Sequence, residues 1–171
     1  MTIRLLQPGD YDSLLALAAS TGVFQAHELD TLAEVLTDYH AVCQAEYGHQ
    51  AWTLVDSGQP IGFVYLAPTV MTDQTWELWW IAVSKLQQGR GLGRRLLKHA
   101  EQAAHAAGAR LLVIETSSLP HYRPTCLFYQ QNGYSQVAAI PDFYADGDNK
   151  LIFFKRLRAK SSVNNSPIMK E

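Results

Sequence analysis

The fold of this chain is decided by residues 75–108, which read TWELWWIAVSKLQQGRGLGRRLLKHAEQAAHAAG. Residues 75–83 are rich in aromatic and β-branched types, a composition typical of a strand. Residues 91–107 predict a helix that Gly108 ends, because their apolar members recur at helical spacing: Leu92, Leu96, Ala100, Ala103 and Ala107. The stretch therefore predicts a strand, a glycine-rich loop and an amphipathic helix in succession.

The loop segment Gln88-Gly89-Arg90-Gly91-Leu92-Gly93 lies where this helix begins. A helix start presents unpaired backbone N–H groups and the positive end of the macrodipole, and glycines let a phosphate come close. The dinucleotide fingerprint fails because Arg94 stands where its third glycine is required, and no Gly-Lys-Ser/Thr of a P-loop follows. What remains is Gln88-x-x-Gly91-x-Gly93, an anion site beside Arg90 and Arg94; a glycine-rich turn without a ligand is the alternative.

The rest of the chain supplies further helices and strands around this unit. Helices are predicted from Asp10 to about Ser20, over residues 29–45 and over 125–131, and strands at 3–5, 51–56, 61–67, 111–114, 134–139 and 151–156. Consecutive strands joined by tight turns favour antiparallel pairing, whereas the strand–helix–strand step at 76–114 favours a parallel pair. We expect an α/β fold: a mixed, mostly antiparallel sheet with one parallel pair and helices on both faces. Residues 1–158 form the expected single domain, and residues 159–171 a flexible tail.

Composition excludes several classes of protein. The chain has 171 residues, 47% hydrophobic and 18% charged, and a formal charge of −2, which is typical of a globular domain and not of a nucleic-acid-binding protein. The two cysteines, Cys43 and Cys126, have no metal-ligand or disulfide spacing, and no histidine pair predicts a metal site. The start of the sequence is unlike a signal peptide and no apolar run reaches membrane length. We expect a cytoplasmic protein with no metal and no membrane or nucleic-acid partner.

The pattern Gln88-x-x-Gly91-x-Gly93 resembles the cofactor motif R/Q-x-x-G-x-G/A of the GNAT superfamily of acetyltransferases. Two other segments extend the resemblance over roughly residues 3–157. Ile81-Ala82-Val83 stands where the family has a bulged, splayed strand, and residues 127–134 look like its F-Y-x-x-x-G-F/Y segment. The resemblance implies a GNAT-like fold and acetyl-CoA as cosubstrate, bound by Ile81, Ala82, Val83, Gln88, Gly89, Arg90, Gly91, Leu92, Gly93, Arg94, Tyr122, Thr125 and Tyr129. Tyr122 and Thr125 depart from the family's usual asparagine and alanine, although their hydroxyls remain available to the cofactor arm.

The resemblance also implies two catalytic residues. Tyr129 corresponds to the acid that protonates the departing sulfur, and a phenol stays protonated at neutral pH; the alternative is a tyrosine that only packs a helix on the sheet. Glu77 corresponds to a base that deprotonates the amine, and burial among tryptophans would raise its pKa. An ion pair or a solvent-facing carboxylate is the alternative for Glu77, and Glu115 is a second candidate base.

The acceptor side is less defined by the sequence. In the family the acceptor reaches the cofactor from loops near the first two helices and the last strand pair, which implies Phe24, Phe143 and Tyr144, with Trp79 on the splayed strand, as substrate-binding residues. Aromatic faces and carboxylates attract cations, although Asp148 is also expected in a hairpin turn. Trp79 and Trp80 are adjacent on one strand, so alternation predicts that they face opposite sides, and one of them could lie at a homodimer surface.

The expected function is an N-acetyltransferase that moves the acetyl group of acetyl-CoA to a primary amine of a small molecule by direct attack in a ternary complex. Acetylation of a protein or peptide amine is the alternative within the same class. A non-catalytic CoA-binding sensor on the same fold is the alternative from another class.

Overall fold

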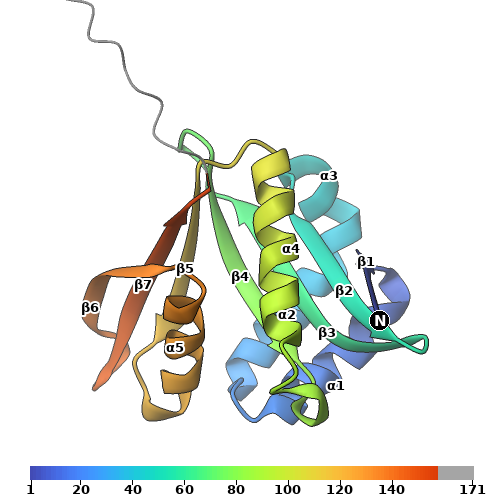
Figure 1. Ribbon diagram of the computed structural model, residues 1–171, viewed down its shortest axis with the longest axis horizontal. Coiled ribbons are helices and arrows are strands. Elements are labelled where there is room, and N and C mark those ends of the chain that lie inside the picture. The colour runs from blue at the N-terminus through green and yellow to red at the C-terminus, as the bar shows by residue number, and fades with distance from the viewer. Residues whose placement is uncertain (158–171) are drawn as a thin grey trace, which may run out of the picture.

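Seven strands form one mixed sheet in the order β1-β2-β3-β4-β5-β7-β6 (Figure 1). A computed structural model describes residues 1–157, and the predicted tail, residues 159–171, lies outside them. The strands are β1 (Thr2–Leu5), β2 (Gln50–Asp56), β3 (Gln59–Pro68), β4 (Thr75–Val83), β5 (Leu111–Ser117), β6 (Ser135–Ala145) and β7 (Asp148–Arg156). The helices are α1 (Tyr11–Thr21), α2 (Ala26–Asp38), α3 (Gln44–Tyr47), α4 (Leu92–Ala106) and α5 (Arg123–Gln131).

The pairing of β4 with β5 is parallel, and the other strand pairs are antiparallel. This confirms the predicted fold class. The parallel pairing joins only residues 75–78 to residues 111–114, although β4 continues to Val83 and β5 to Ser117. Beyond Leu78 the two strands therefore diverge, and the edge of β4 that faces β5 has no strand partner among residues 1–157.

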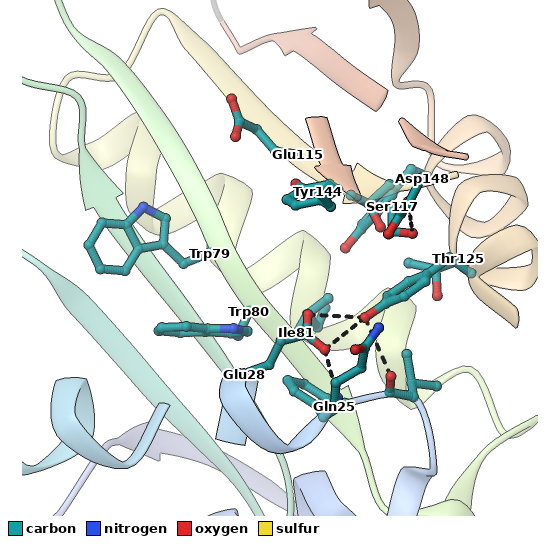
Figure 2. A pocket seen from close by; sticks show the side chains of 15 residues that line it. Gln25, Glu28, Trp79, Trp80, Ile81, Glu115, Ser117, Thr125, Tyr144 and Asp148 are labelled. Carbon is teal, nitrogen blue, oxygen red and sulfur yellow. Dashed lines mark hydrogen bonds between the residues drawn. The ribbon is translucent and has the colours of Figure 1, made fainter. Parts of the chain in front are cut away.

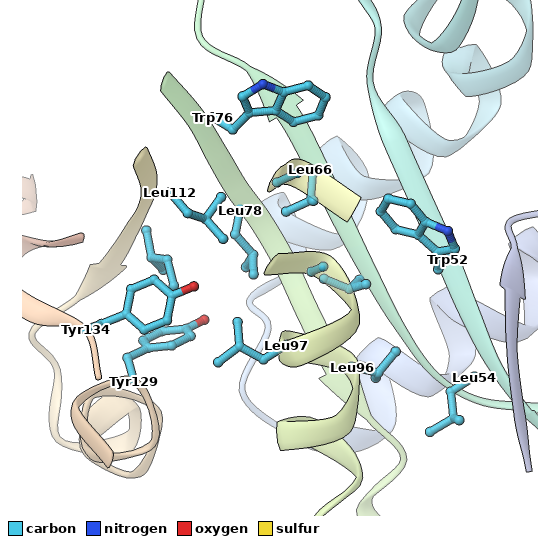
Figure 3. Packing of buried hydrophobic residues seen from close by; sticks show 14 of the residues in the cluster. Trp52, Leu54, Leu66, Trp76, Leu78, Leu96, Leu97, Leu112, Tyr129 and Tyr134 are labelled. Atoms are coloured by element: carbon cyan, nitrogen blue, oxygen red, sulfur yellow. The ribbon is translucent and has the colours of Figure 1, made fainter. Parts of the chain in front are cut away.

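Helices cover both faces of the sheet: α4 and α5 lie on one face, and α1 and α2 on the other (Figure 1). The face under α4 is packed by one apolar cluster that includes Leu66, Leu78, Leu97 and Leu112 (Figure 3). The opposite cluster joins α1 and α2 to Phe63 and Tyr65 of β3. Alternation of side chains along the strands separates these two clusters.

The helix predicted over residues 29–45 begins earlier, at Ala26, and is interrupted by a π-helical turn over Tyr39–Cys43 before α3. A π turn contains one more residue than an α turn, so the side chains after it change their phase around the axis. Tyr39 is fully buried there and its hydroxyl accepts a hydrogen bond from the backbone N–H of Ala51 at 3.0 Å. The π-helical turn thus coincides with a tertiary contact of Tyr39 that the local sequence pattern does not reveal.

Asp10 occupies the N-cap position of α1, but its side chain makes no capping hydrogen bond. It is buried, and its carboxylate accepts two hydrogen bonds from the Arg4 guanidinium, both 2.7 Å long. The backbone N–H of Gln7 and the hydroxyl of Thr53 also donate to it. Asp10 therefore anchors β1 and β2 to the turn before α1.

The prediction that Trp79 and Trp80 face opposite sides is wrong. The register of β3 against β4 shifts here, so that Tyr65 pairs with Trp80 while Leu66 pairs with Leu78. Trp79 is the extra residue of a β-bulge, and a bulge breaks the alternation of side chains. Both indoles consequently contact the Tyr65 ring, with centroid distances of 5.6 Å each.

Candidate active site

Two neighbouring cavities open at the point where β4 and β5 diverge. The glycine-loop groove, of about 540 Å³, lies between the end of β4, the start of α4 and one side of α5. The acidic cavity, of about 160 Å³, lies between the loop before α2, β4, β5 and the β6–β7 hairpin. Val23, Ile81 and Thr125 line both cavities, so the two meet at these residues.

The glycine loop forms one wall of the groove. Gly89 and Gly91 have φ angles of +75° and +74°, which favour glycine, and a side chain added at either would meet no neighbouring atom. The first helical hydrogen bond of α4 runs from Arg95 N–H to the Gly91 carbonyl. The N–H groups before Arg95 therefore face the groove mouth without helical partners, the arrangement that binds phosphate.

Side chains fasten this loop to the strand before it. The Gln88 amide donates to the Val83 carbonyl at 3.1 Å, which holds the loop against the end of β4. Arg94 lines the groove, whereas Arg90 does not and instead contacts the Gln87 side chain. The other predicted cofactor residues that line the groove are Ile81, Ala82, Val83, Gln88, Gly89, Gly91, Leu92, Gly93 and Thr125.

Tyr129 of α5 lines the acidic cavity, one helical turn after Thr125. It is only 4% exposed, and its ring packs on those of Phe128, Tyr134 and Phe153. Within residues 1–157 its hydroxyl makes no hydrogen bond. Burial raises the pKa of this phenol, so it is protonated throughout the neutral range and can donate a proton.

Three carboxylates line the acidic cavity: Glu28 from α2, Glu115 from β5 and Asp148 from β7 (Figure 2). None of the cavity's lining residues, all drawn from residues 1–157, is a lysine, arginine or histidine. Burial, followed by the nearby charges of Glu115 and Asp148, raises the pKa of Tyr144 to about 12. The cavity is therefore a region of negative potential, which favours a cationic occupant.

These carboxylates are held by different kinds of partner. The Tyr122 hydroxyl donates to both oxygens of Glu28 at 3.0 Å, and the Gln25 N–H donates to one of them at 2.7 Å. Asp148 is 6% exposed and accepts from the Ser117 hydroxyl at 2.5 Å and from the Ser118 N–H at 3.2 Å. Glu115 forms an ion pair of 2.5 Å with Lys150.

Aromatic residues complete the cavity, and most of them were expected on the acceptor side. Phe24, Trp79 and Tyr144 line it, together with Trp80. Tyr122, expected to contact the cofactor, also lines this cavity and not the larger groove.

A second bulge brings Tyr144 to the cavity. The register between β6 and β7 shifts between Ile140 and Ala145, and Asp142 within this bulge has a φ of +51°. Its carboxylate accepts a hydrogen bond from the Gly147 N–H at 2.8 Å, which stabilises the bulge. Phe143 is not among the lining residues; it is 49% exposed, with the Lys150 ammonium 3.6 Å from its ring centre.

Glu77 lies on β4 opposite Val113 of β5, outside the linings of both cavities. Burial, and then the charge of Glu115, raises the pKa of Glu77. The structure thus places a carboxyl group with a raised pKa beside Glu115, which does line the cavity.

Glu28, Thr116 and Ser117 are polar residues of the acidic cavity that the sequence did not point to, and Asp148 was expected in a hairpin turn. Asp148 does begin the strand after the expected hairpin turn, at Gly147 with φ +79°, but its side chain is buried in the cavity. Glu28 forms a capping box with Gln25 at the start of α2, a pattern that marks a helix start and carries no information about a site.

Comparison with known proteins identifies the family. Residues 47–136 match the family described as acetyltransferase (GNAT) domain. A GNAT-family structure from Desulfovibrio desulfuricans is 31% identical to this chain with a TM-score of 0.87, over 92% of this chain and 99% of that one. The chain belongs to the GNAT acetyltransferases and is an acetyl-CoA-dependent transferase.

More distant structures share the fold. An aminoglycoside 6'-N-acetyltransferase complexed with coenzyme A is 18% identical, with a TM-score of 0.75 over 94% of this chain and 99% of that one. The ribosomal-protein-S18-alanine N-acetyltransferase of Escherichia coli is 19% identical, with a TM-score of 0.73 over 95% and 97%. No curated protein matches the sequence significantly.

Two negative findings apply to residues 1–157. In that part of the chain, no three or more His, Cys, Asp or Glu side chains are grouped so that they could hold a metal ion. No helix in the same part is long and apolar enough to cross a membrane.

Proposed function

We propose that this enzyme transfers the acetyl group of acetyl-CoA to a primary amine of a small molecule, by direct attack in a ternary complex. The observation that carries the proposal is the meeting of the two cavities at Val23, Ile81 and Thr125, with Tyr129 lining the acidic cavity one helical turn after Thr125. A donor in the groove and an acceptor in the acidic cavity would reach each other only there.

The groove suits acetyl-CoA by its shape and chemistry. The α4 start and the open positions at Gly89 and Gly91 leave room for a pyrophosphate to contact the backbone N–H groups. The unpaired edge of β4 at Ile81–Val83 offers backbone donors and acceptors to the amide groups of an extended arm. We assign the pyrophosphate to residues 88–94 and the arm to Ile81, Ala82, Val83 and Thr125.

Acetyl-CoA, when bound, supplies an acetyl thioester whose carbonyl carbon accepts the neutral amine. The C–N bond forms and the C–S bond breaks, so one proton must leave the nitrogen and one must reach the sulfur. Tyr129 holds a proton for the sulfur, since burial keeps its phenol protonated. Its hydroxyl is free of other hydrogen bonds within residues 1–157, so it is available for this contact.

We assign the removal of the amine proton to the carboxyl pair of Glu77 and Glu115. Glu115 lines the cavity, and Glu77 carries the raised pKa that a base near neutral pH requires. Because Glu77 lies outside the lining, its proton transfer would pass through water or through Glu115. The Ile81 segment of β4 is the assigned source of a backbone N–H for the developing oxyanion.

The two alternatives predict other behaviour. A protein or peptide acceptor would need to place its chain in the acidic cavity, whose carboxylates and aromatic rings suit a compact cation instead. A CoA-binding sensor would bind acetyl-CoA without using Tyr129. We therefore favour the small-molecule reaction.

We also propose a homodimer that forms through β6, and a cytoplasmic location. β6 is an edge strand of the sheet and all of its residues are exposed, including Val137, Ile140 and Phe143. An exposed edge with apolar side chains is a surface for pairing with a second copy. Cys43 and Cys126 are both free thiols, which agrees with a reducing compartment. Analytical ultracentrifugation tests the dimer, and a chain that sediments as a monomer at micromolar concentration contradicts it.

The experiment that tests the reaction is a thiol-release assay with acetyl-CoA and a panel of amines and peptides. Turnover with small amines, together with mass-spectrometric detection of an N-acetyl product, supports the proposal. Turnover with peptides alone contradicts the small-molecule acceptor, and acetyl-CoA binding without any turnover supports the sensor.

A further inference from the structure

The acidic cavity contains more negative charge than the side chains of residues 1–157 neutralise. Of its three carboxylates, only Glu115 forms an ion pair within residues 1–157, with Lys150. Glu28 and Asp148 receive hydrogen bonds from hydroxyl and backbone N–H groups alone. Neutral donors fix the position of a carboxylate but leave its charge in place, and a buried charge without a counter-charge is costly.

The same cavity also contains aromatic faces and an unused hydroxyl. Trp79, Trp80 and Tyr144 line it, and rings of this kind bind ammonium groups through cation–π contacts. The Tyr129 side chain lines the cavity, is 4% exposed and makes no hydrogen bond within residues 1–157. Its hydroxyl is therefore available to a ligand in the cavity.

We propose that the acceptor carries at least two cationic groups, as a linear polyamine or an amino sugar does. This proposal rests on the proposed acetyltransferase function. One amine, in its neutral form, forms the new C–N bond beside Tyr129 and gives up a proton to the carboxyl pair of Glu77 and Glu115. The C–S bond breaks, and the sulfur receives a proton from Tyr129. The second group remains protonated and pairs with Glu28 and Asp148, which supply the binding that a single amine cannot use.

The charge pattern also predicts which amines are rejected. An amino acid places a carboxylate close to its amine, and the cavity lining offers it no lysine, arginine or histidine among residues 1–157. Repulsion by Glu28 and Asp148 would add to the cost of desolvating that carboxylate. Amino acids with a free carboxylate are therefore expected to be poor acceptors.

The first test compares three four-carbon amines of different charge with an amino sugar. Initial rates are measured with diaminobutane, aminobutanol, aminobutyrate and the amino sugar kanamycin at fixed acetyl-CoA. Because a charged hydrogen bond is stronger than a neutral one, we expect kcat/KM for the better of the two polycations to exceed that for aminobutanol by about tenfold or more. Preference for diaminobutane identifies the linear source and preference for kanamycin the amino-sugar source.

The second test removes the carboxylates one at a time. Glu28→Gln and Asp148→Asn keep an oxygen for the existing hydrogen bonds and remove the charge. Each is expected to lower kcat/KM for the preferred polycation by about tenfold and to change that for aminobutanol by less than about threefold. The matched controls are Glu34→Gln and Asp38→Asn, on exposed positions of the same helix α2 as Glu28, which should change neither rate.

The outcomes separate the two proposals. If aminobutanol is acetylated as efficiently as the polycations, or if both carboxylate variants lower kcat/KM for all amines equally, the dication proposal is overturned while the acetyltransferase function stands. If no amine is acetylated, both proposals fail. Because the two carboxylates lie on separate elements, α2 and β7, a folding defect in one variant leaves the other as a complete test.

Discussion

Replacement of Tyr129 by phenylalanine tests the assigned acid most directly, because it removes one oxygen and keeps the ring. That ring packs on Phe128, Tyr134 and Phe153 with centroid distances of 5.5, 6.0 and 5.9 Å. The hydroxyl makes no hydrogen bond within residues 1–157, so its loss leaves no protein group unpaired there. We expect the free energy of unfolding to change by less than about 0.5 kcal/mol, which is a shift of about 2 °C or less in Tm.

The effect on catalysis should be far larger than the effect on stability. Proton transfer by a positioned side chain contributes about a hundredfold to ten-thousandfold in rate, equivalent to about 3–5 kcal/mol of transition-state stabilisation. In Tyr129→Phe we therefore expect kcat to fall by about a hundredfold or more. The Kd for acetyl-CoA, measured by isothermal titration calorimetry, should stay within about twofold because no other contact is lost.

Tyr134→Phe is the matched control for this substitution. Tyr134 is as deeply buried as Tyr129 and its hydroxyl also lacks a partner within residues 1–157, but it lines neither the groove nor the acidic cavity. Loss of the Tyr134 hydroxyl should leave kcat unchanged. Full activity in Tyr129→Phe, or equal losses in the two variants, would refute the role of Tyr129 as the acid.

Three further changes test other parts of the structure. Burial and then the charge of Glu115 raise the pKa of Glu77, and its carboxyl acts as a base only when ionised, so activity is lost as pH falls through the raised pKa. Glu77→Gln should lower kcat and abolish this acidic limb of the pH–rate profile. A limb that is retained in the variant assigns the base to another residue. Gly91→Ala forces a side chain to φ +74° and should cost about 1–2 kcal/mol of stability. It should also weaken acetyl-CoA binding measured by calorimetry. The matched control Gly58→Ala, at φ +82° in the β2–β3 turn, should cost the same stability without affecting binding. Burial alone would raise the pKa of Asp10, but the hydrogen bonds from Arg4, Gln7 and Thr53 lower it. The contribution of Asp10 to the free energy of unfolding is therefore present above the unfolded pKa of about 3.9 and is lost as pH falls through the folded value. Asp10→Asn should destabilise the protein by about 2 kcal/mol at pH 7, and in chemical denaturation this difference should shrink below about pH 4. A difference that does not depend on pH contradicts the ion pair.

The glycine loop and the helix that follows it were predictable because their signals are local. Gly89, Gly91 and the following amphipathic helix lie within one short segment, and a helix start binds anions wherever glycines leave it open. The same holds for the parallel step from β4 to β5, since a strand, a helix and a strand in succession have few ways to pack. These features required only residue types and spacing.

Two bulges show where residue patterns stop being informative. An extra residue at Trp79 turns both tryptophans to one face, and the bulge over residues 141–144 directs Tyr144 into the acidic cavity. A bulge depends on how two strands pair across the sheet, and the alternation of residue types along one strand does not reveal it. The prediction that Trp79 and Trp80 face opposite sides of the sheet failed for this reason.

What the sequence by itself determined is therefore the fold class, the glycine loop and the acetyl-CoA-dependent chemistry of its family. The grouping of carboxylates in the acidic cavity was decided by the tertiary structure, because Glu28, Glu115 and Asp148 come from a helix and two strands that are distant in sequence. A loop that binds phosphate uses consecutive backbone N–H groups and so leaves a local signature. A cavity that binds a cation uses side-chain charges brought together across the sheet, and such a juxtaposition exists only once the chain has folded.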